Sequence, residues 1–149
     1  MSSWRERGPT RWIALLAFVA MILVAGCAAE TIEPEPHRGA DTPEEAVLAL
    51  VDAINAADWE TRYALYAEPE VDFETAVSEW ETAAETYEDF TVHETRRSAE
   101  DLAEVRVTYR AETTPPGGDR YEVVVTGDGE WWAVQRVDGG WKAQWMPRQ

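Results

Sequence analysis

The sequence predicts an α+β domain in which three helices are followed by a curved antiparallel sheet of four or five strands. Two observations favour this order. Between about residues 42 and 87, apolar residues recur every three or four positions, which is the spacing of a buried helix face. From residue 90 onward, apolar and polar residues alternate, as they do in strands that bury one face. At 149 residues, the chain has room for one such domain.

The first helix is predicted from the chemistry of its first turn. Thr42 can cap the helix, Pro43 suits the first helical position, and Glu45 can close a capping box. The apolar residues that follow at helical spacing predict the buried face. They are Val47, Leu50, Val51 and Ile54.

Two further helices are expected before the strands begin. Asp58 can cap a helix over residues 59–67, which Pro69 ends. A third helix is predicted roughly over residues 71–87, with Glu85 among the residues on its solvent side. Its apolar side carries Phe73, Ala76, Val77, Trp80, Ala84 and Tyr87.

Glycine-rich tripeptides divide the alternating C-terminal part of the chain. Gly127-Asp128-Gly129 and Asp138-Gly139-Gly140 are both predicted to be hairpin turns. The last strand is expected to bury Trp141, Ala143 and Trp145 on one face.

The N-terminal 26 residues are typical of a signal peptide. A short basic region precedes residues 12–24, an uninterrupted apolar run of 13 residues. A membrane span usually needs about 20 apolar residues, so this run suits the apolar region of a signal peptide better. Val24-Ala25-Gly26-Cys27 follows at its end.

That tetrapeptide resembles the lipobox of bacterial lipoproteins. The resemblance implies that Cys27 receives a diacylglyceryl group, that residues 1–26 are removed, and that the new amino group can take a further acyl chain such as palmitate. The lipid would hold the chain in the cell membrane, facing the extracytoplasmic side. Cys27 is the only cysteine, so it has no partner for an internal disulfide. The alternatives are an uncleaved short anchor and an ordinary secretory signal cut near Ala28-Ala29.

The remaining chain divides into an acidic, proline-containing tether over residues 27–40 and a single predicted domain over residues 41–149. The net charge is −16, and the part from Cys27 onward, with 10 basic and 28 acidic residues, carries −18. Such a surface repels phosphate, so the sequence argues against nucleic-acid binding. Lys142 is the only lysine. This composition fits either a GC-rich genome or a salt-tolerant host.

The order of elements and two short motifs resemble the nuclear transport factor 2-like superfamily, whose fold is a cystatin-like cone of curved sheet wrapped on helices. The motifs are Ile54-Asn55-Ala56-Ala57-Asp58-Trp59 and Val137-Asp138-Gly139-Gly140-Trp141-Lys142, and the resemblance covers about residues 42–147. Residues 140–147 are also similar to the end of the N-terminal accessory domain of penicillin-binding transpeptidases. The Ser-x-x-Lys nucleophile motif of those enzymes is absent from the chain. These motifs predict a fold rather than an activity.

The superfamily includes isomerases and dehydratases that use a carboxylate or histidine base and a tyrosine donor inside the cone. Such chemistry needs an ionisable base on an apolar face, yet the faces predicted to be buried carry tyrosines without an isolated Asp, Glu or His. His93 is predicted on the solvent side of its strand. No metal or cofactor is expected, because no ligand spacing supports one.

The candidate contacts for a ligand or partner are Tyr63, Tyr109, Trp131 and Trp132. Adjacent strand residues point to opposite faces, so one tryptophan of the pair either lines the cavity or can anchor a partner, including a second copy of the domain. The sequence therefore favours a non-catalytic binding or accessory lipoprotein. Its partner would be an envelope protein, a peptidoglycan fragment or a small apolar ligand. The alternative is a cone-fold enzyme of the isomerase or dehydratase type.

Overall fold

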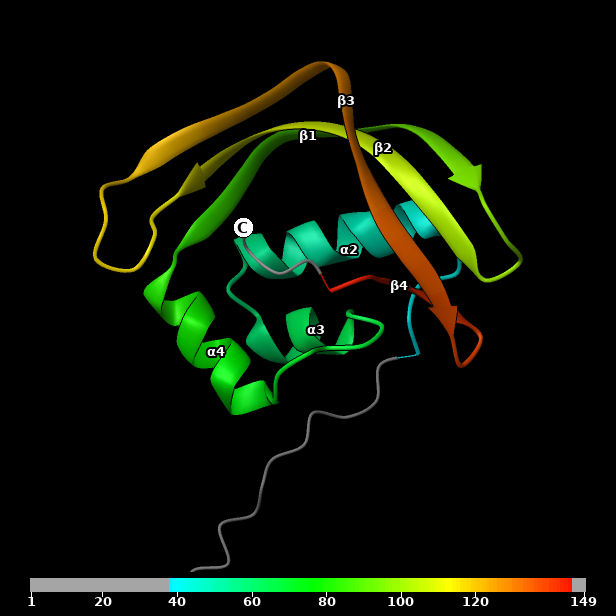
Figure 1. Cartoon of the computed structure of the whole chain (residues 1–149), viewed down its shortest axis with the longest axis horizontal. Coiled ribbons are helices and arrows are strands. Elements are labelled where there is room, and N and C mark those ends of the chain that lie inside the picture. The colour runs from blue at the N-terminus through cyan, green and yellow to red at the C-terminus, as the bar shows by residue number, and fades with distance from the viewer. Residues whose placement is uncertain (1–37, 146–149) are drawn as a thin grey trace, which may run out of the picture. The chain divides into compact units, whose positions relative to one another are not determined.

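The computed structural model describes residues 38–145, which form three helices packed against a four-stranded antiparallel sheet. The strand order is β1-β2-β3-β4, so each strand pairs with its neighbour in the chain. In Figure 1 the strands arch over α2, while α3 and α4 lie on the other side of that helix. The predicted α+β architecture is confirmed, with four strands.

Helix α2 (Pro43–Asn55) begins as the capping chemistry predicts. The Thr42 hydroxyl accepts a hydrogen bond from the Glu45 backbone N–H, and the Glu45 carboxylate accepts one from the Thr42 backbone N–H, both at 3.2 Å. The apolar face of α2 packs against residues of every strand of the sheet. This helix is therefore the centre of the core.

Helices α3 (Trp59–Ala64) and α4 (Phe73–Thr82) are both shorter than predicted. Beyond α3, the chain runs beside the last strand, where the Ala67 N–H donates to the carbonyl of Ala143 at 2.8 Å. Beyond α4, Tyr87 pairs with Ala111 in the sheet instead of extending the helix. In both places backbone pairing with distant strands overrides the local helical pattern.

Strands β1 (Glu85–Arg97), β2 (Leu102–Thr113) and β3 (Tyr121–Val137) form the long part of the sheet. The predicted hairpin turn at residues 127–129 is wrong, because β3 continues through it. Its partner residues change from Tyr109 opposite Val125 to Val107 opposite Glu130, which is a bulge. Gly127 and Gly129 have φ angles of 67° and 70°. Glycine supplies positive φ in bulges as readily as in turns, and a bulge bends its strand.

Strand β4 (Gly140–Ala143) follows the second predicted hairpin turn, which is confirmed. Asp138 and Gly139, at φ 52° and 86°, form a two-residue connection of the type that matches strand twist. Trp141 and Ala143 are each 2% exposed, as expected. Trp145 lies beyond the strand, where its ring packs against those of Tyr66 at 4.7 Å and Trp80 at 5.9 Å.

The chain enters the fold through a close contact with β4. The Ala40 N–H donates to the Trp141 carbonyl at 2.9 Å, and the Trp141 N–H donates to the Ala40 carbonyl at 2.8 Å. A Cβ atom on Gly140 would lie 1.8 Å from the carbonyl oxygen of Arg38. Only glycine at this position allows the two backbone segments to approach so closely.

Among residues 38–145, no helix is both long and apolar enough to cross a membrane. The predicted signal peptide, the lipobox and Cys27 lie outside the described residues.

Candidate functional site

The interior between the curved sheet and α2 is occupied by four aromatic rings. Tyr87 and Phe90 of β1, Tyr109 of β2 and Trp132 of β3 have ring centroids 5.1 to 6.0 Å apart in every pairing. Most of these pairs meet edge to face, the geometry that aromatic quadrupoles favour. We call these four residues the interior aromatic cluster.

An ion pair between α3 and β1 lies beside this cluster. The Arg62 Nη2 atom is 3.3 Å from Glu85 Oε2, and the Tyr87 hydroxyl donates to Glu85 Oε1 at 2.7 Å. Burial, together with the negative charge of Glu85, raises the pKa of Tyr87. The phenol therefore stays protonated as a hydrogen-bond donor, and both carboxylate oxygens of Glu85 are engaged.

The two tyrosines proposed from the sequence lie at different places. Tyr109 belongs to the interior aromatic cluster, and its hydroxyl donates to Glu130 Oε2 at 2.7 Å. Tyr63 lies between α3 and α4, donates to the Val71 carbonyl at 2.9 Å and contacts Phe73 edge-on at 5.4 Å. Burial raises the pKa of both phenols. The structure therefore does not unite Tyr63 and Tyr109 in one site.

Trp131 and Trp132 lie on opposite faces of β3, as the strand geometry requires. Trp132 is 3% exposed inside the core. Trp131 is on the outer face, where the guanidinium carbons of Arg96 and Arg106 lie 4.1 and 6.0 Å from its ring centroid. These arginines also pair with carboxylates of neighbouring strands. Trp131 is thus partly covered by the domain's own cations.

His93, on the same strand as Arg96, is exposed as expected, and its Nε2 lies 2.7 Å from the Thr108 hydroxyl.

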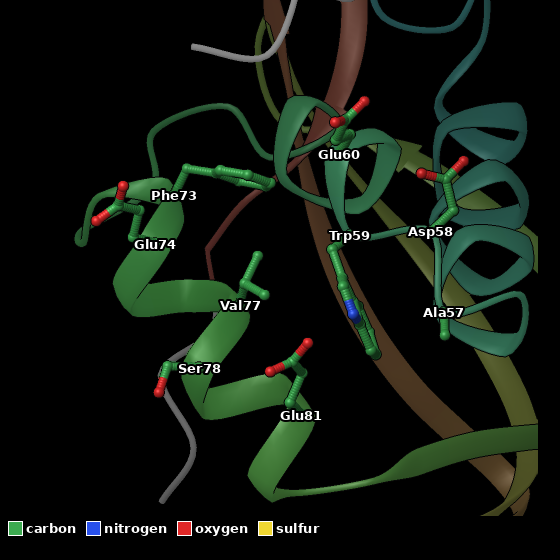
Figure 2. A pocket seen from close by; sticks show the side chains of 9 residues that line it. All are labelled: Ala57, Asp58, Trp59, Glu60, Phe73, Glu74, Val77, Ser78 and Glu81. Atoms are coloured by element: carbon green, nitrogen blue, oxygen red, sulfur yellow. The ribbon is translucent and has the colours of Figure 1, made fainter. Parts of the chain in front are cut away.

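A groove of about 450 Å³ separates α3 from α4 (Figure 2). In Figure 2, Trp59 of α3 and Val77 and Glu81 of α4 point into the space between the two helices, and the ring of Phe73 is directed towards α3. The residues that line the groove are Ala57, Asp58, Trp59, Glu60, Phe73, Glu74, Val77, Ser78 and Glu81.

Two helix caps and the aromatic contacts behind them fix the positions of the side chains that form the walls of the groove. The Asp58 carboxylate accepts from the Thr61 N–H at 3.1 Å, and the Asp72 carboxylate accepts from the Thr75 N–H at 2.9 Å. These caps place Trp59 and Phe73 at the first position of each helix. The Trp59 ring packs 5.9 Å from Trp80. The groove is therefore held by local capping and by contacts to a buried tryptophan.

The sequence predicted neither the groove nor the Arg62–Glu85 pair. Glu85 was expected on the solvent side of a longer third helix, but it lies in β1, where Glu85 and Tyr87 share one face. The signal that could have found this pair is the alternation in Glu85-Thr86-Tyr87. Phe73 and Val77 were assigned to the apolar side of the third helix, because periodicity does not distinguish a helix face that is buried from one that lines a groove.

Within residues 38–145, no group of three or more His, Cys, Asp or Glu residues is arranged to hold a metal ion.

The described residues have the nuclear transport factor 2-like cone fold, and the likeness to one solved structure supports this assignment. The ketosteroid isomerase-like protein from Erwinia carotovora atroseptica is similar with a TM-score of 0.50 and 19% identity, covering 76% of this chain and 92% of that chain. A candidate aromatic ring hydroxylase from Novosphingobium aromaticivorans has a TM-score of 0.45 and 18% identity, covering 68% and 80% of the two chains. No family model and no curated protein matches the sequence. At such identity the first likeness establishes the fold alone.

Proposed function

We propose that this chain is a membrane-anchored extracytoplasmic lipoprotein whose cone-fold domain is a non-catalytic binding or accessory domain of the cell envelope. The observation that carries the anchor is Val24-Ala25-Gly26-Cys27, placed directly after an apolar run of signal-peptide length. Two acyl chains on Cys27 would hold the protein firmly, because each buried methylene adds roughly 0.8 kcal/mol. The residues between Cys27 and Arg38 would then serve as the tether, since Ala40 already pairs with β4.

The anchor is tested by replacing the acceptor thiol. Cys27→Ser is expected to leave a precursor that keeps residues 1–26 and incorporates no labelled palmitate, because the hydroxyl does not replace the thiol in the lipobox. Ser78→Ala, within α4, serves as a matched control and should be labelled like the native chain. Equal labelling of Cys27→Ser and the native chain would contradict the proposal.

Three features of the described residues support binding rather than catalysis. The interior aromatic cluster packs ring against ring in the part of the cone where an isomerase would hold its substrate. Glu85 uses one oxygen for Arg62 and the other for Tyr87, so it would have to give up an existing contact to act as a base. The groove between α3 and α4, in contrast, is open to solvent and is large enough for a small molecule or a peptide side chain.

The alternative is an enzyme of the cone-fold isomerase or dehydratase type, and the Glu85–Tyr87 pair is the observation that favours it. A carboxylate next to a protonated phenol is an arrangement that can remove a proton and polarise a carbonyl. The test is exchange of α-hydrogens of small apolar ketones in D₂O, followed by NMR. Exchange that the protein catalyses and Glu85→Gln abolishes would favour the enzyme over the binding domain.

The binding proposal is tested by photocrosslinking in cells that express the full chain. A benzoylphenylalanine at Val77 reports on the groove, and one at Glu100, in the exposed connection between β1 and β2, is the control. We expect a light-dependent adduct from position 77 that position 100 does not give. The adduct's mass then separates an envelope protein from a peptidoglycan fragment or a small ligand. If position 77 captures nothing, the groove is not the binding surface.

A further inference from the structure

We propose that the groove between α3 and α4 binds an organic ammonium cation, meaning a positively charged nitrogen that carries apolar substituents. This inference rests on the proposed binding function and names the chemical class of its ligand. Three properties of the groove carry it: an aromatic and apolar wall, carboxylates around that wall, and an indole cluster that already holds a cation.

The wall offers a π surface to a ligand with an apolar body. Trp59 and Val77 face the same space from opposite helices, and Phe73 closes the groove at the first turn of α4 (Figure 2). Contacts behind the wall keep these rings in place, since Trp59 packs against Trp80 and Phe73 meets Tyr63 edge-on. A rigid aromatic wall of this kind favours cations, because the face of an aromatic ring is electronegative.

The charge of the lining selects the sign of the ligand. Four carboxylates line the groove and no basic residue does. Asp58 is occupied as a helix cap, while the ion pairs found within residues 38–145 use carboxylates other than Glu60, Glu74 and Glu81. Figure 2 shows the Glu81 carboxylate reaching into the space between α4 and the Trp59 ring. An anion would be repelled here, and a neutral ligand would gain nothing from these charges.

The indoles beside the groove already hold a cation. The Arg62 guanidinium carbon lies 4.2 Å from the ring centroid of Trp80 and 5.9 Å from that of Trp59. Arg62 is 4% exposed, so this contact is made away from water, where such interactions are strongest. The groove thus offers a ligand the pairing of indole and carboxylate that Arg62 has with Trp80 and Glu85. An ammonium ion with apolar substituents suits this lining better than a metal ion, because no metal-holding cluster of side chains is present among the described residues.

The test compares choline with its neutral isostere, 3,3-dimethylbutan-1-ol, by titration calorimetry on the full chain in dodecyl maltoside micelles. The two compounds have nearly the same shape and differ by the charge on one atom. We expect choline to bind at least about threefold more tightly than the alcohol, since the cation–π and carboxylate contributions depend on that charge. Equal binding of the two, or binding of neither, would overturn the proposal.

Variants locate the binding in the groove. Glu81→Gln removes one charge beside Trp59, and Glu79→Gln removes the same charge from α4 outside the groove lining. We expect Glu81→Gln to weaken choline binding at least about twofold and Glu79→Gln to leave it unchanged. Trp59→Leu should weaken it at least about threefold, with circular dichroism confirming that the variant is folded. Equal effects of the two glutamine variants would show a general attraction to an acidic surface and overturn the site.

This result can be separated from that of the binding function itself. If choline fails to bind while a crosslinker at Val77 still captures a partner, the groove is a binding surface and the ligand class is wrong. If both experiments fail, the groove is not the binding surface, and the proposed ligand class fails together with the proposed site.

Discussion

Arg62 is a charged side chain that the fold keeps 4% exposed between Glu85 and the rings of Trp59 and Trp80. The Arg62 side chain extends from α3 to Glu85, the first residue of β1. Removing the guanidinium takes away the positive charge beside a largely buried carboxylate, which costs more than losing a surface pair.

Arg62→Met is therefore expected to lower the free energy of unfolding by about 3 kcal/mol, since Glu85 then lacks its cation. The control is Arg96→Met, whose ion pair with Glu104 is exposed and screened by water, so its loss should change stability much less. Urea unfolding of both variants measures the difference. Similar decreases in the free energy of unfolding of the two variants would mean that the buried pair stabilises the domain no more than the exposed one.

At the scale of single helices, the capping aspartates Asp58 and Asp72 make the stability of the domain depend on pH. The Thr75 N–H and, secondly, its hydroxyl donate to Asp72 and lower the pKa of that carboxyl below its ordinary value of 3.8. The Thr61 hydroxyl and, secondly, its backbone N–H lower the pKa of Asp58. A lowered carboxyl pKa means that the stabilisation is present above the unfolded-state pKa and is lost as the pH falls through the folded-state pKa.

Asp72→Asn should accordingly reduce the acid sensitivity of the domain. Asparagine caps a helix about as well as aspartate but does not titrate. Relative to the native chain, we expect the variant to lose less stability between neutral pH and pH values below about 4. Denaturant unfolding at the two pH values, with Asp119→Asn in the β2–β3 connection as the control, measures this. An unchanged pH dependence would show that the cap's charge is unimportant.

Strand β4 distinguishes two tryptophans that the sequence treated alike. Trp141 is 2% exposed in the core, whereas Trp145 lies past the strand end and packs edge-on against Tyr66 and at a tilt against Trp80. Trp141→Ala should cost about 3–5 kcal/mol, typical of a large buried aromatic. Trp145→Ala should cost distinctly less, and Gln144→Ala less than about 0.5 kcal/mol. Thermal or urea melts rank the three. A larger loss at Trp145 than at Trp141 would contradict this assignment of the core.

Local chemistry made some elements predictable and left others hidden. The capping box at Thr42 and the Asp138-Gly139 turn depend on residues close in sequence, and both were predicted. The ends of α3 and α4 depend on pairing with strands far along the chain, and both were predicted too long. Two glycines with positive φ can form either a turn or a bulge. The sequence does not distinguish the two, so β3 was predicted as two strands that meet at Gly127. The Arg62–Glu85 pair joins a helix to a strand across 23 residues, which no local pattern reveals.

The fold as a whole is expected to form without the N-terminal part of the chain. The core is built from residues between Ala46 and Ala143. The Ala40–Trp141 hydrogen bonds extend the paired region slightly before α2. A fragment of residues 38–149 should therefore fold alone and be more stable than one of residues 41–149. Circular dichroism and urea melts compare the two; a random-coil spectrum for both would contradict this prediction.

The contact between Ala40 and Trp141 also decides where a mechanical load enters the domain. Any pull along the chain ahead of Arg38 first reaches two short hydrogen bonds to the strand that carries a central core tryptophan. The force thus arrives at β4 before it can unwind α2 from its capped end. Under tension, the domain should stay folded until these two hydrogen bonds break. The force at which it unfolds would therefore depend on Gly140, because only glycine lets the two backbone segments approach so closely.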